Sequence, residues 1–213
     1  MNRVILSVCM LLFLQIHCLF AQDYRIENIT SEYIRFEKGL SQNTVKCILH
    51  DQEGYIWAGT WSGLNRFDGY SFKTLSINMV NPSQGLTHAT IVGIAEDDQG
   101  YIWAACEKGL NRISKTDFSI TQFTTEKNSA DGMVCDSINT LFASKNGSIW
   151  IGTSQGILVL NTKTLKFNHV EHNPRDYTTI SSNKVTCFAE DAQGFMWVGT
   201  SLGLNKMDPK TNE

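Results

Sequence analysis

Short apolar segments separated by tight polar turns dominate the hydrophobic pattern of this chain. The first clear set comprises candidate strands at 45–50, 55–60, 64–67 and 71–75. The first two turns end in glycine, which supplies the positive φ that a short hairpin loop requires. No segment shows sustained 3.6-residue apolar spacing with caps, and the three prolines fall between candidate strands. The pattern therefore predicts an all-β chain.

The same pattern occurs four times, and its first copy is DQEGYIWAGTWSGLNRF at residues 51–67. Later copies begin at Asp97, Ser144 and Asp191, and the tryptophans of successive copies lie 46, 47 and 47 residues apart. The positions that keep these intervals are Trp57, Trp103, Trp150 and Trp197, the first-turn glycines Gly54, Gly100, Gly147 and Gly194, and the second-turn glycines Gly63, Gly109, Gly156 and Gly203. Four short antiparallel strands in a repeat of about 47 residues are typical of a β-propeller blade.

We therefore predict a β-propeller with four blades, in which a large tryptophan ring fills the space between neighbouring sheets. The blades are expected at about residues 40–77, 86–123, 133–170 and 180–213, each with four antiparallel strands except the last, which lacks its own outer strand. Residues 33–36 resemble an outer strand without a preceding blade. Either this strand closes a ring of four blades, or the ring is larger and residues 33–213 form a partial β-propeller.

Longer polar connections follow the first three blades, at 76–90, 124–137 and 171–184. In a propeller they lead from the outermost strand of one blade to the innermost strand of the next. They therefore share a face with the second turn of each blade. Because connecting segments on a rigid scaffold are where binding residues concentrate, we expect functional residues on this face.

The N-terminal segment differs from the repeats. Arg3 supplies a positive start, residues 4–20 are mostly apolar, and the run ends in the small residue Ala21. These features are typical of a secretory signal peptide at 1–21, which is followed by a polar lead at 22–32. A retained membrane anchor is the alternative, but polar residues leave the apolar run short of the roughly 20 residues that span a bilayer. We expect the chain to be exported.

Composition and charge exclude some classes of partner. The chain has 213 residues, 42% of them hydrophobic, and a formal net charge of −3. Its charges are scattered singly, so there is no basic stripe for nucleic acid and no polybasic patch for a membrane surface. Cleavage after the signal would leave four cysteines without a CxxC spacing, namely Cys47, Cys106, Cys135 and Cys187. Export permits a disulfide among them without requiring one.

Cys47 and Cys187 share one repeat position, where the other copies have Gly93 and Thr140. A position that accepts these four residue types indicates packing of a small side chain rather than a reactive thiol.

The pattern V..I..D..G.IW.GT..GL.RFD....F, preceded by GLSQNTV in the first repeat and by TISSNKV in the fourth, resembles the two-component-regulator propeller repeats of periplasmic sensors in Bacteroidetes hybrid two-component systems. The resemblance covers residues 33–208 and is most specific in repeats one and four. Repeat two departs from it at Ala105 and Cys106. Repeat three departs at Ser144 and in the segment GILVL.

The resemblance implies a larger protein. Such sensors have two consecutive seven-bladed propellers and an immunoglobulin-like domain, then a membrane helix, a histidine kinase and usually a DNA-binding output. They typically respond to oligosaccharides. This chain would then be an N-terminal fragment that carries the first four blades. The implied partners are a small-molecule or oligosaccharide ligand, the absent C-terminal propeller, membrane and kinase regions, and a second copy in a homodimer of the intact sensor. The implied location is the periplasm.

Three sets of residues invite a catalytic or metal-binding interpretation but are better explained by the repeat. Ser154 and Ser201 match the nucleophile-elbow pattern G-x-S-x-G, yet an elbow joins a strand to a helix, whereas these serines fill the second turn of a repeat. Asp51, Asp97 and Asp191 share one turn position, which we expect them to cap. The histidines share no ligand spacing. We expect no metal, no cofactor and no catalytic residue in this chain.

Trp61 breaks the pattern of the second turn, where the other repeats have Glu or Ser. An exposed indole there would stack on a sugar ring while nearby amides bond its hydroxyl groups. The alternative is that Trp61 packs against the neighbouring connection, because tryptophan is usually largely buried. The candidate ligand-binding residues are Trp61, Glu107, His88 and Asn81.

The leading functional interpretation is a non-enzymatic, ligand-sensing propeller segment that signals to a histidine kinase. The second is a secreted propeller enzyme, such as a lyase or a glycoside-active protein. That enzyme would need acids or histidines clustered at the central channel, whereas the inner strands here carry apolar or small residues. The third is a self-contained four-bladed interaction module.

Overall fold

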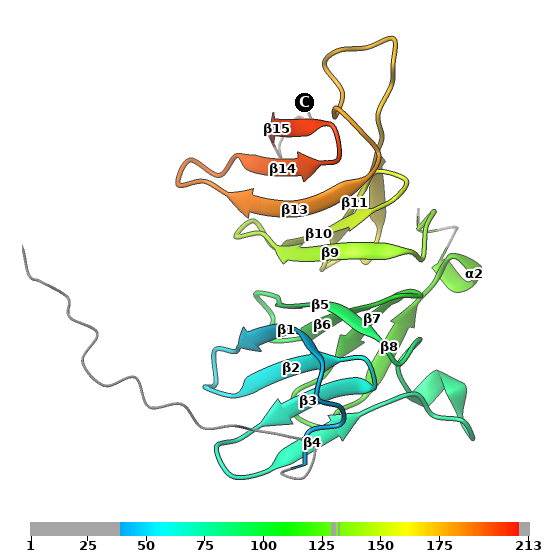
Figure 1. Cartoon of the computed structure of the whole chain (residues 1–213), viewed down its shortest axis with the longest axis vertical. Coiled ribbons are helices and arrows are strands. Elements are labelled where there is room, and N and C mark those ends of the chain that lie inside the picture. The colour runs from blue at the N-terminus through cyan, green and yellow to red at the C-terminus, as the bar shows by residue number, and fades with distance from the viewer. Residues whose placement is uncertain (1–38, 129–130, 132, 209–213) are drawn as a thin grey trace, which may run out of the picture. The chain divides into compact units, whose positions relative to one another are not determined.

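The computed structural model describes residues 39–128, 131 and 133–208. The expected signal peptide (1–21), polar lead (22–32) and closing strand (33–36) lie outside these residues and stay predictions. The regular secondary structure of the described residues is almost entirely β-strand, which confirms the predicted all-β propeller class (Figure 1).

The described strands form four antiparallel sheets, one for each sequence repeat. Blade one consists of β1 (Val45–His50), β2 (Ile56–Thr60), β3 (Gly63–Phe67) and β4 (Phe72–Leu75). Blade two consists of β5 (Ile91–Glu96), β6 (Ile102–Cys106), β7 (Leu110–Ile113) and β8 (Ile120–Phe123). Blade three consists of β9 (Ile138–Ala143), β10 (Ser148–Thr153), β11 (Ile157–Asn161) and β12 (Phe167–Val170). Blade four consists of β13 (Val185–Glu190), β14 (Met196–Thr200) and β15 (Gly203–Met207).

Each sheet keeps its strands in sequence order. The first strands of successive blades are neighbours, since β5 contacts β1 and β9, and β9 also contacts β13. They are therefore the inner strands of the propeller. The three-stranded sheet of blade four agrees with the expected absence of its own outer strand up to Asp208, the last described residue. Two short helices, η2 (Pro82–Gln84) and α2 (Thr125–Asn128), lie in the first two connections.

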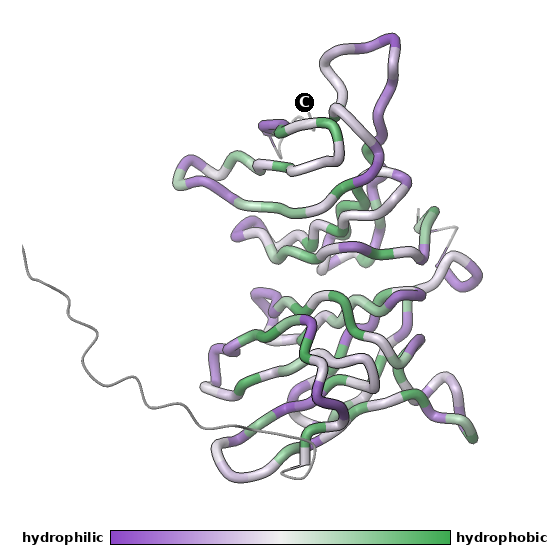
Figure 2. Tube along the Cα trace, in the orientation of Figure 1, coloured by the Kyte–Doolittle hydropathy of each residue, from purple (hydrophilic) through white to green (hydrophobic). Residues whose placement is uncertain are grey.

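Between successive blades, the described residues form three apolar cores. Each core combines the face of one blade that carries the tryptophan, here called the rear face, with the opposite or front face of the next blade. Trp57 and Leu64 lie on the rear face of blade one, and Ile91 and Ile102 on the front face of blade two; all four are fully buried. Hydrophobic positions accordingly concentrate on the strands, whereas the turns are more hydrophilic (Figure 2).

The first-turn aspartate connects the turn to this core. In blade one, Asp51 Oδ1 accepts hydrogen bonds from the backbone N of Glu53 at 3.0 Å and of Tyr55 at 2.9 Å. Its Oδ2 accepts a hydrogen bond from Trp57 Nε1 at 2.7 Å. The expected turn cap is therefore present, and the same carboxylate also satisfies a fully buried indole N–H. Asp97 and Trp103 repeat this contact at 2.7 Å in blade two.

Blade three lacks the carboxylate. Ser144 occupies the aspartate position, and its Oγ accepts only a long 3.4 Å hydrogen bond from the backbone N of Asn146. Among the described residues, Trp150 Nε1 is buried without a hydrogen-bond partner. The tryptophan of blade three is therefore held by packing alone. Its unsatisfied buried donor is destabilising.

The position shared by Cys47 and Cys187 faces a glycine of the paired strand, Gly59 in blade one and Gly199 in blade four. Cys47 packs there as predicted, whereas Cys187 is exposed. Cys47 lies opposite Gly59 in the strand pair, and a Cβ on Gly59 would stand 2.6 Å from Cys47 Sγ. In blade two the inner strand has Gly93 at this position, and its partner is Ala105 instead of glycine. In repeat two the larger residue of the pair is therefore Ala105 on the second strand, whereas in repeat one it is Cys47 on the inner strand. Burial raises the pKa of Cys47 to about 11, so its thiol is poorly reactive at neutral pH.

The hydrogen bond between aspartate and tryptophan predicts different costs for one substitution in two blades. Trp103→Phe and Trp150→Phe remove similar apolar area from fully buried sites. Only the former also deprives a carboxylate of its partner, so it should lower the free energy of unfolding by about 2 kcal/mol more. Urea denaturation of both variants measures the difference, and equal losses would contradict the stabilising role of the hydrogen bond.

Candidate functional site

The connections and the second turns form one end of the blades, here called the connection face. Backbone hydrogen bonds join them: Gly109 N donates to Asp136 O at 2.9 Å, Gly156 N to Asn183 O at 2.8 Å, and Ser201 N to Lys184 O at 2.9 Å. The sequence prediction placed these segments on a shared face. Ser154 and Ser201 lie in such turns between paired strands, as the repeat pattern indicated.

An asparagine that is fully buried in blades one and two and partly buried in blade four fixes the segment that enters each of these blades. In blade two, Asn111 Oδ1 accepts a hydrogen bond from Thr87 N at 3.0 Å. Asn111 Nδ2 donates to Thr87 Oγ1 at 3.0 Å and to Ala104 O at 3.3 Å. The corresponding pairs are Asn65 with Ser41 and Asn205 with Ser181. The sequence analysis missed these anchors.

In the sequence, the anchors can be recognised because both of their residues are replaced together in one repeat. Asn and its Ser or Thr partner recur 24 residues apart in three repeats, and repeat three replaces both, by Leu158 and Val134. An asparagine that disappears together with its partner indicates a contact between the two positions.

In blades two and four, the residue after the anchored Thr or Ser contacts the first residue of the second turn. In blade two these residues are His88 and Glu107, and His88 Nδ1 is 3.8 Å from Glu107 Oε2. In blade four, Ser182 Oγ and Ser201 Oγ are hydrogen-bonded at 3.0 Å. The fold thus brings together two of the four candidate residues, which are 19 positions apart in sequence.

The other two candidates are more isolated. Trp61 is 54% exposed, in contrast to the fully buried Trp57 in the adjacent strand, so much of its indole faces solvent. Asn81 is exposed, and its backbone N donates to Asn78 Oδ1 at 2.8 Å. Within the described residues, no hydrogen bond or ion pair joins Trp61 or Asn81 to the pair of His88 and Glu107.

A hollow of about 520 Å³ lies on the connection face between the first two connections. Its lining includes Thr87, Lys108 and Pro82, each of which is the sequence neighbour of a candidate residue, His88, Glu107 or Asn81. The candidate side chains themselves do not line it. We call this space the connection hollow. Its remaining lining comprises Ile77, Asn78, Met79, Leu86, Gln122, Thr124, Glu126, Lys127 and Asp136.

Hydrogen bonds fix the walls of the connection hollow. Gln122 Nε2 donates to the carbonyl oxygens of Pro82 at 2.7 Å and Gly85 at 2.8 Å, which holds the first connection against β8. Lys127 Nζ donates to Gln122 Oε1 at 2.6 Å. On the far wall, Asp136 Oδ1 and Oδ2 accept hydrogen bonds from the backbone N and Oγ1 of Thr125, both at 2.7 Å. The hollow is therefore preformed.

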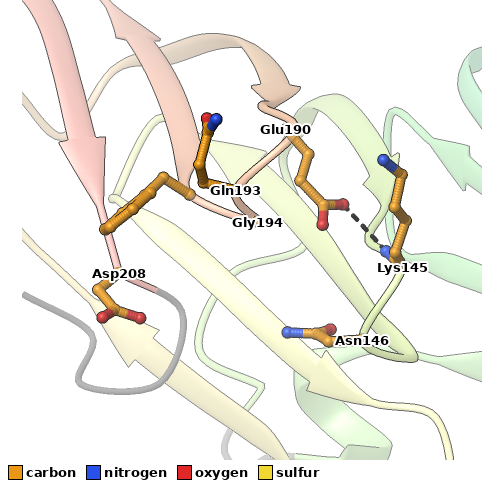
Figure 3. A pocket seen from close by; sticks show the side chains of 7 residues that line it. Lys145, Asn146, Glu190, Gln193, Gly194 and Asp208 are labelled. Carbon is orange, nitrogen blue, oxygen red and sulfur yellow. Dashed lines mark hydrogen bonds between the residues drawn. The ribbon is translucent and has the colours of Figure 1, made fainter.

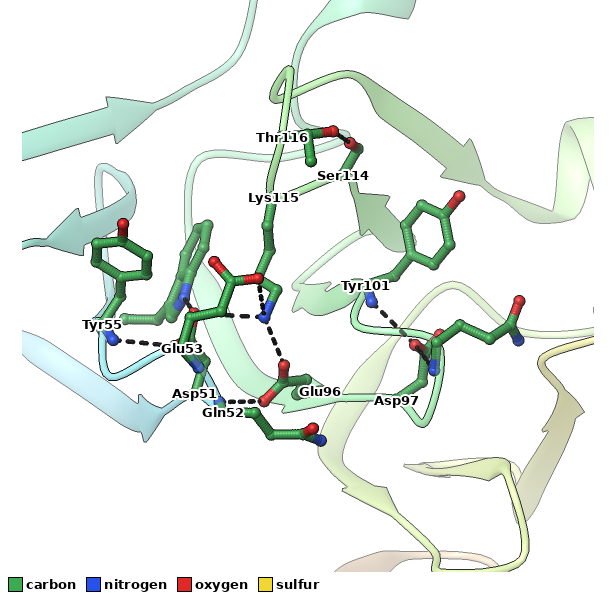
Figure 4. Close-up of polar contacts among 12 residues, drawn as sticks. Asp51, Gln52, Glu53, Tyr55, Glu96, Asp97, Tyr101, Ser114, Lys115 and Thr116 are labelled. Carbon is green, nitrogen blue, oxygen red and sulfur yellow. Dashed lines mark hydrogen bonds and ion pairs between the residues drawn. The ribbon is translucent and has the colours of Figure 1, made fainter.

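At the opposite end of the blades, a buried lysine joins blade one to blade two (Figure 4). Lys115 Nζ lies 2.7 Å from Glu96 Oε1 and 3.0 Å from Glu53 Oε1, and only 6% of its side chain is exposed. Asp51 Oδ2 is 3.9 Å away. Glu96 Oε2 also accepts a hydrogen bond from the backbone N of Gln52 at 2.9 Å. These contacts tie the first turn of blade one to β5 and to the turn that follows β7.

The opposite charges of this cluster stabilise the contact between blades one and two. Burial alone would lower the pKa of Lys115, but hydrogen bonds to Glu96 and Glu53 raise that pKa above its ordinary value. Burial alone would raise the pKa of Asp51, but hydrogen bonds from Trp57 and from the turn backbone, with Lys115 nearby, hold it below its ordinary value. Both shifts favour the charged forms, so the cluster is ion-paired at neutral pH.

A second hollow, of about 370 Å³, lies between the first turns of blades three and four (Figure 3). Lys145, Asn146, Glu190 and Asp208 line it together with the first turn of blade four. Glu190 Oε2 accepts a hydrogen bond from Lys145 N at 2.9 Å, which repeats the contact between Glu96 and Gln52. Glu190 therefore connects blade four to blade three.

Comparison with known proteins agrees with the repeat geometry. A model of the two component regulator propeller matches residues 39–62, 132–155 and 179–201, which run from the entry of blades one, three and four to their second turns. The chain carries two component regulator propeller repeats. Histidine kinase P4 from Formosa agariphila is 54% identical over 35 residues, which are 16% of this chain and 3% of that protein.

Two solved extracellular domains of hybrid two component systems from B. thetaiotaomicron share the fold of this regulator propeller segment. The BT4673 domain superposes with a TM-score of 0.66 at 22% identity, over 79% of this chain and 22% of that one. The BT3049 domain gives a TM-score of 0.56 at 20% identity, over 85% of this chain and 31% of that one. The chain thus spans less than a third of either neighbour. In the described part of the chain, no helix has the length and apolar character to cross a membrane.

Replacing Lys115 should weaken the joint between blades one and two. Lys115→Met leaves the buried Glu96 without its cation, and we expect the free energy of unfolding at neutral pH to fall by about 3 kcal/mol. Lys163→Met removes an exposed lysine and is the matched control, with little expected effect.

The pH dependence follows from the two pKa shifts. The raised pKa of Lys115 means that its contribution is complete below its unfolded pKa, about 10.4, and is lost as pH rises through the folded pKa. The lowered pKa of Asp51 means that its contribution is complete above about 3.9 and is lost as pH falls through the folded pKa. Urea denaturation across pH should therefore show a difference between wild type and Lys115→Met that narrows at both extremes. A difference independent of pH would contradict the ion pairing.

Proposed function

We propose that this chain is an exported, non-enzymatic sensor segment that binds an oligosaccharide on its connection face and transmits binding to a histidine kinase elsewhere in its sensor. The connection hollow of about 520 Å³ is the observation that carries the proposal. The matches to the two component regulator propeller supply the signalling context, because neighbours of the same fold are extracellular domains of hybrid two component systems. The expected signal peptide would deliver the segment to the periplasm.

The lining of the connection hollow suits a sugar. Carbohydrates present hydroxyl groups that both donate and accept hydrogen bonds, beside apolar ring faces. Lys108 and Asn78 offer donors, Glu126 offers an acceptor, and Ile77 and Met79 offer apolar surface. A few polar groups that converge on partly apolar surface are typical of small-molecule sites.

Trp61 and the pair of His88 and Glu107 extend this chemistry over the connection face. The half-exposed indole of Trp61 provides a flat apolar surface with one donor at its edge. Glu107 is more than half exposed, with 56% of its side chain in solvent, and its carboxylate is available to a sugar hydroxyl. An extended oligosaccharide, rather than a single sugar, would contact both the hollow and the surrounding residues.

Signal transmission would follow from the position of the hollow. It is bounded by the connection from blade one to blade two and by the connection from blade two to blade three. A ligand there contacts segments that leave two different blades. It would therefore shift the populations of domain arrangements in the intact sensor by binding one arrangement more tightly than another.

Loss of the indole should weaken carbohydrate binding. Isothermal titration calorimetry with an oligosaccharide panel should identify a ligand, and Trp61→Ala should reduce its affinity about five- to tenfold, because a stacking contact of roughly 1 kcal/mol is lost. Lys108→Ala should weaken binding through the connection hollow. Tyr70→Ala is the matched control, because Tyr70 is 97% exposed in the turn between β3 and β4, at the opposite end of the blade. Affinity unchanged in both Trp61→Ala and Lys108→Ala would overturn the assignment of this face.

A further inference from the structure

Arg66, which lies beside Trp57 on the rear face of blade one, is held by aromatic rings rather than by hydrogen bonds. Its Cζ atom is 4.3 Å from the centroid of the Tyr55 ring and 4.6 Å from that of Phe118, a residue of the turn that follows β7 in blade two. Among the described residues, its buried Nε has no hydrogen-bond partner and its guanidinium forms no ion pair. A buried donor without a partner is uncommon in native proteins and requires a specific explanation.

A second cation lies next to Arg66. Lys73 is directly opposite Arg66 in the pairing of β3 with β4, and its Nζ is 5.3 Å from the centroid of the same Phe118 ring. Lys73 is exposed and has no hydrogen bond or ion pair within the part of the chain that the structure describes. Like charges directly opposite one another on neighbouring strands are destabilising. Blade one therefore keeps two positive charges side by side at a cost in stability.

The acidic side chains of the adjoining turns bond to other groups. Asp68 and Asp117 each accept hydrogen bonds from residues of their own turns. Glu53 pairs with Lys115 at 3.0 Å. No ion pair between described residues joins any of these carboxylates to the two cations. The positive charge of the pair is therefore available to a ligand.

The pair of cations is specific to blade one among the three blades whose outer strand is described. Arg112 takes the place of Arg66 in blade two, but the residue opposite it is the neutral Thr121. The corresponding pair in blade three is Val159 and Asn168. In blade four, Lys206 has a counter-ion, because its Nζ is 3.8 Å from Asp191 Oδ2. The repeat thus accounts for the cation at the position of Arg66 but not for Lys73.

The chemistry of the pair suits an oxyanion. The N–H groups of a guanidinium lie in its plane, so the rings over which Arg66 lies hold the group in place without covering its donors. Two parallel N–H groups match two oxygens of a phosphate or sulfate group, and an ammonium adds a further charge-assisted hydrogen bond. Stacking on Tyr55 and Phe118 fixes the guanidinium before a ligand arrives, which lowers the entropy cost of binding.

We propose that Arg66 and Lys73 form a binding site for a phosphate or sulfate group, either free or carried as an ester on a larger molecule. The site lies between blades one and two, at the end of the blades opposite the connection face. It is therefore independent of the oligosaccharide site proposed above.

Isothermal titration calorimetry of the exported product of the full chain, with inorganic phosphate and inorganic sulfate at constant ionic strength, tests the site. We expect binding by the wild type. Lys73→Thr introduces the residue type that blade two has at this position, and it should weaken binding at least about fivefold, because one charge-assisted bond is lost. Arg66→Lys introduces the residue type of blade four and should also weaken binding, because it removes the paired N–H donors. Lys163→Thr replaces an exposed lysine of blade three and is the matched control, with unchanged affinity.

Glucose 6-phosphate distinguishes the two sources of the group. Tighter binding of this ester than of inorganic phosphate would indicate a group carried on a larger ligand, whereas equal or weaker binding would indicate a free anion. Thermal unfolding of each variant separates lost binding from lost folding. A wild type that binds neither inorganic anion, or equal affinities in Lys73→Thr and Lys163→Thr, would overturn the site.

Discussion

A propeller blade is a thin sheet with apolar side chains on both faces, and each face must be covered by another blade. In this chain the covering is directional, because a rear face with tryptophan and leucine meets a front face with β-branched or other aliphatic residues, as Trp57 and Leu64 meet Ile91 and Ile102. The indole brings one polar group into each core. Asp51 satisfies that group at 2.7 Å with one carboxylate oxygen while the other oxygen caps the turn. In blade one, a single carboxylate thus holds both the first turn and the indole that packs between two blades.

Hydrogen bonds from one side chain also position the connection face. Asn111 lies in the middle of the blade two sheet but holds the backbone and hydroxyl of Thr87, and thereby sets the place of the next residue, His88. In blades two and four, two positions that differ in residue type, one after the anchor and one at the second turn, are brought together above the same asparagine anchor. In blade two they carry an imidazole and a carboxylate, and in blade four two hydroxyl groups. Recognition chemistry can therefore differ from blade to blade without any change in the strands that support it.

Periodicity predicted the strands, the turns and the burial of the tryptophans, because these depend on residues close in sequence and on a repeat of fixed length. It also predicted that the first-turn aspartate caps its turn. It did not reveal the second bond of Asp51 to Trp57, since that bond depends on the direction in which the indole points from β2. That Gly93 and Ala105 face each other could be learned only from the strand register. The pairing of His88 with Glu107 needed the whole blade, because the connection and the turn meet only after the sheet has formed. Three of the four candidate residues, His88, Glu107 and Asn81, lie next to residues of the connection hollow but do not line it. The sequence could not predict this, because it does not give the direction of a side chain in a connection.

Blade three lacks two polar contacts that other blades have. It has Ser144 where other blades have aspartate, and Leu158 and Val134 where three blades have the asparagine anchor. Its tryptophan nevertheless remains fully buried. Both neighbours of blade three are present, and their apolar faces supply the burial that the missing polar contacts would otherwise support. Blade four presents the converse case: its asparagine anchor and its bond from Trp197 to Asp191 are intact, yet Leu204 and Trp197 remain accessible. Polar contacts within a blade therefore fix its internal geometry, whereas burial of its faces requires an adjacent blade. The exposure of Leu204 and Trp197 therefore does not indicate a weakened repeat.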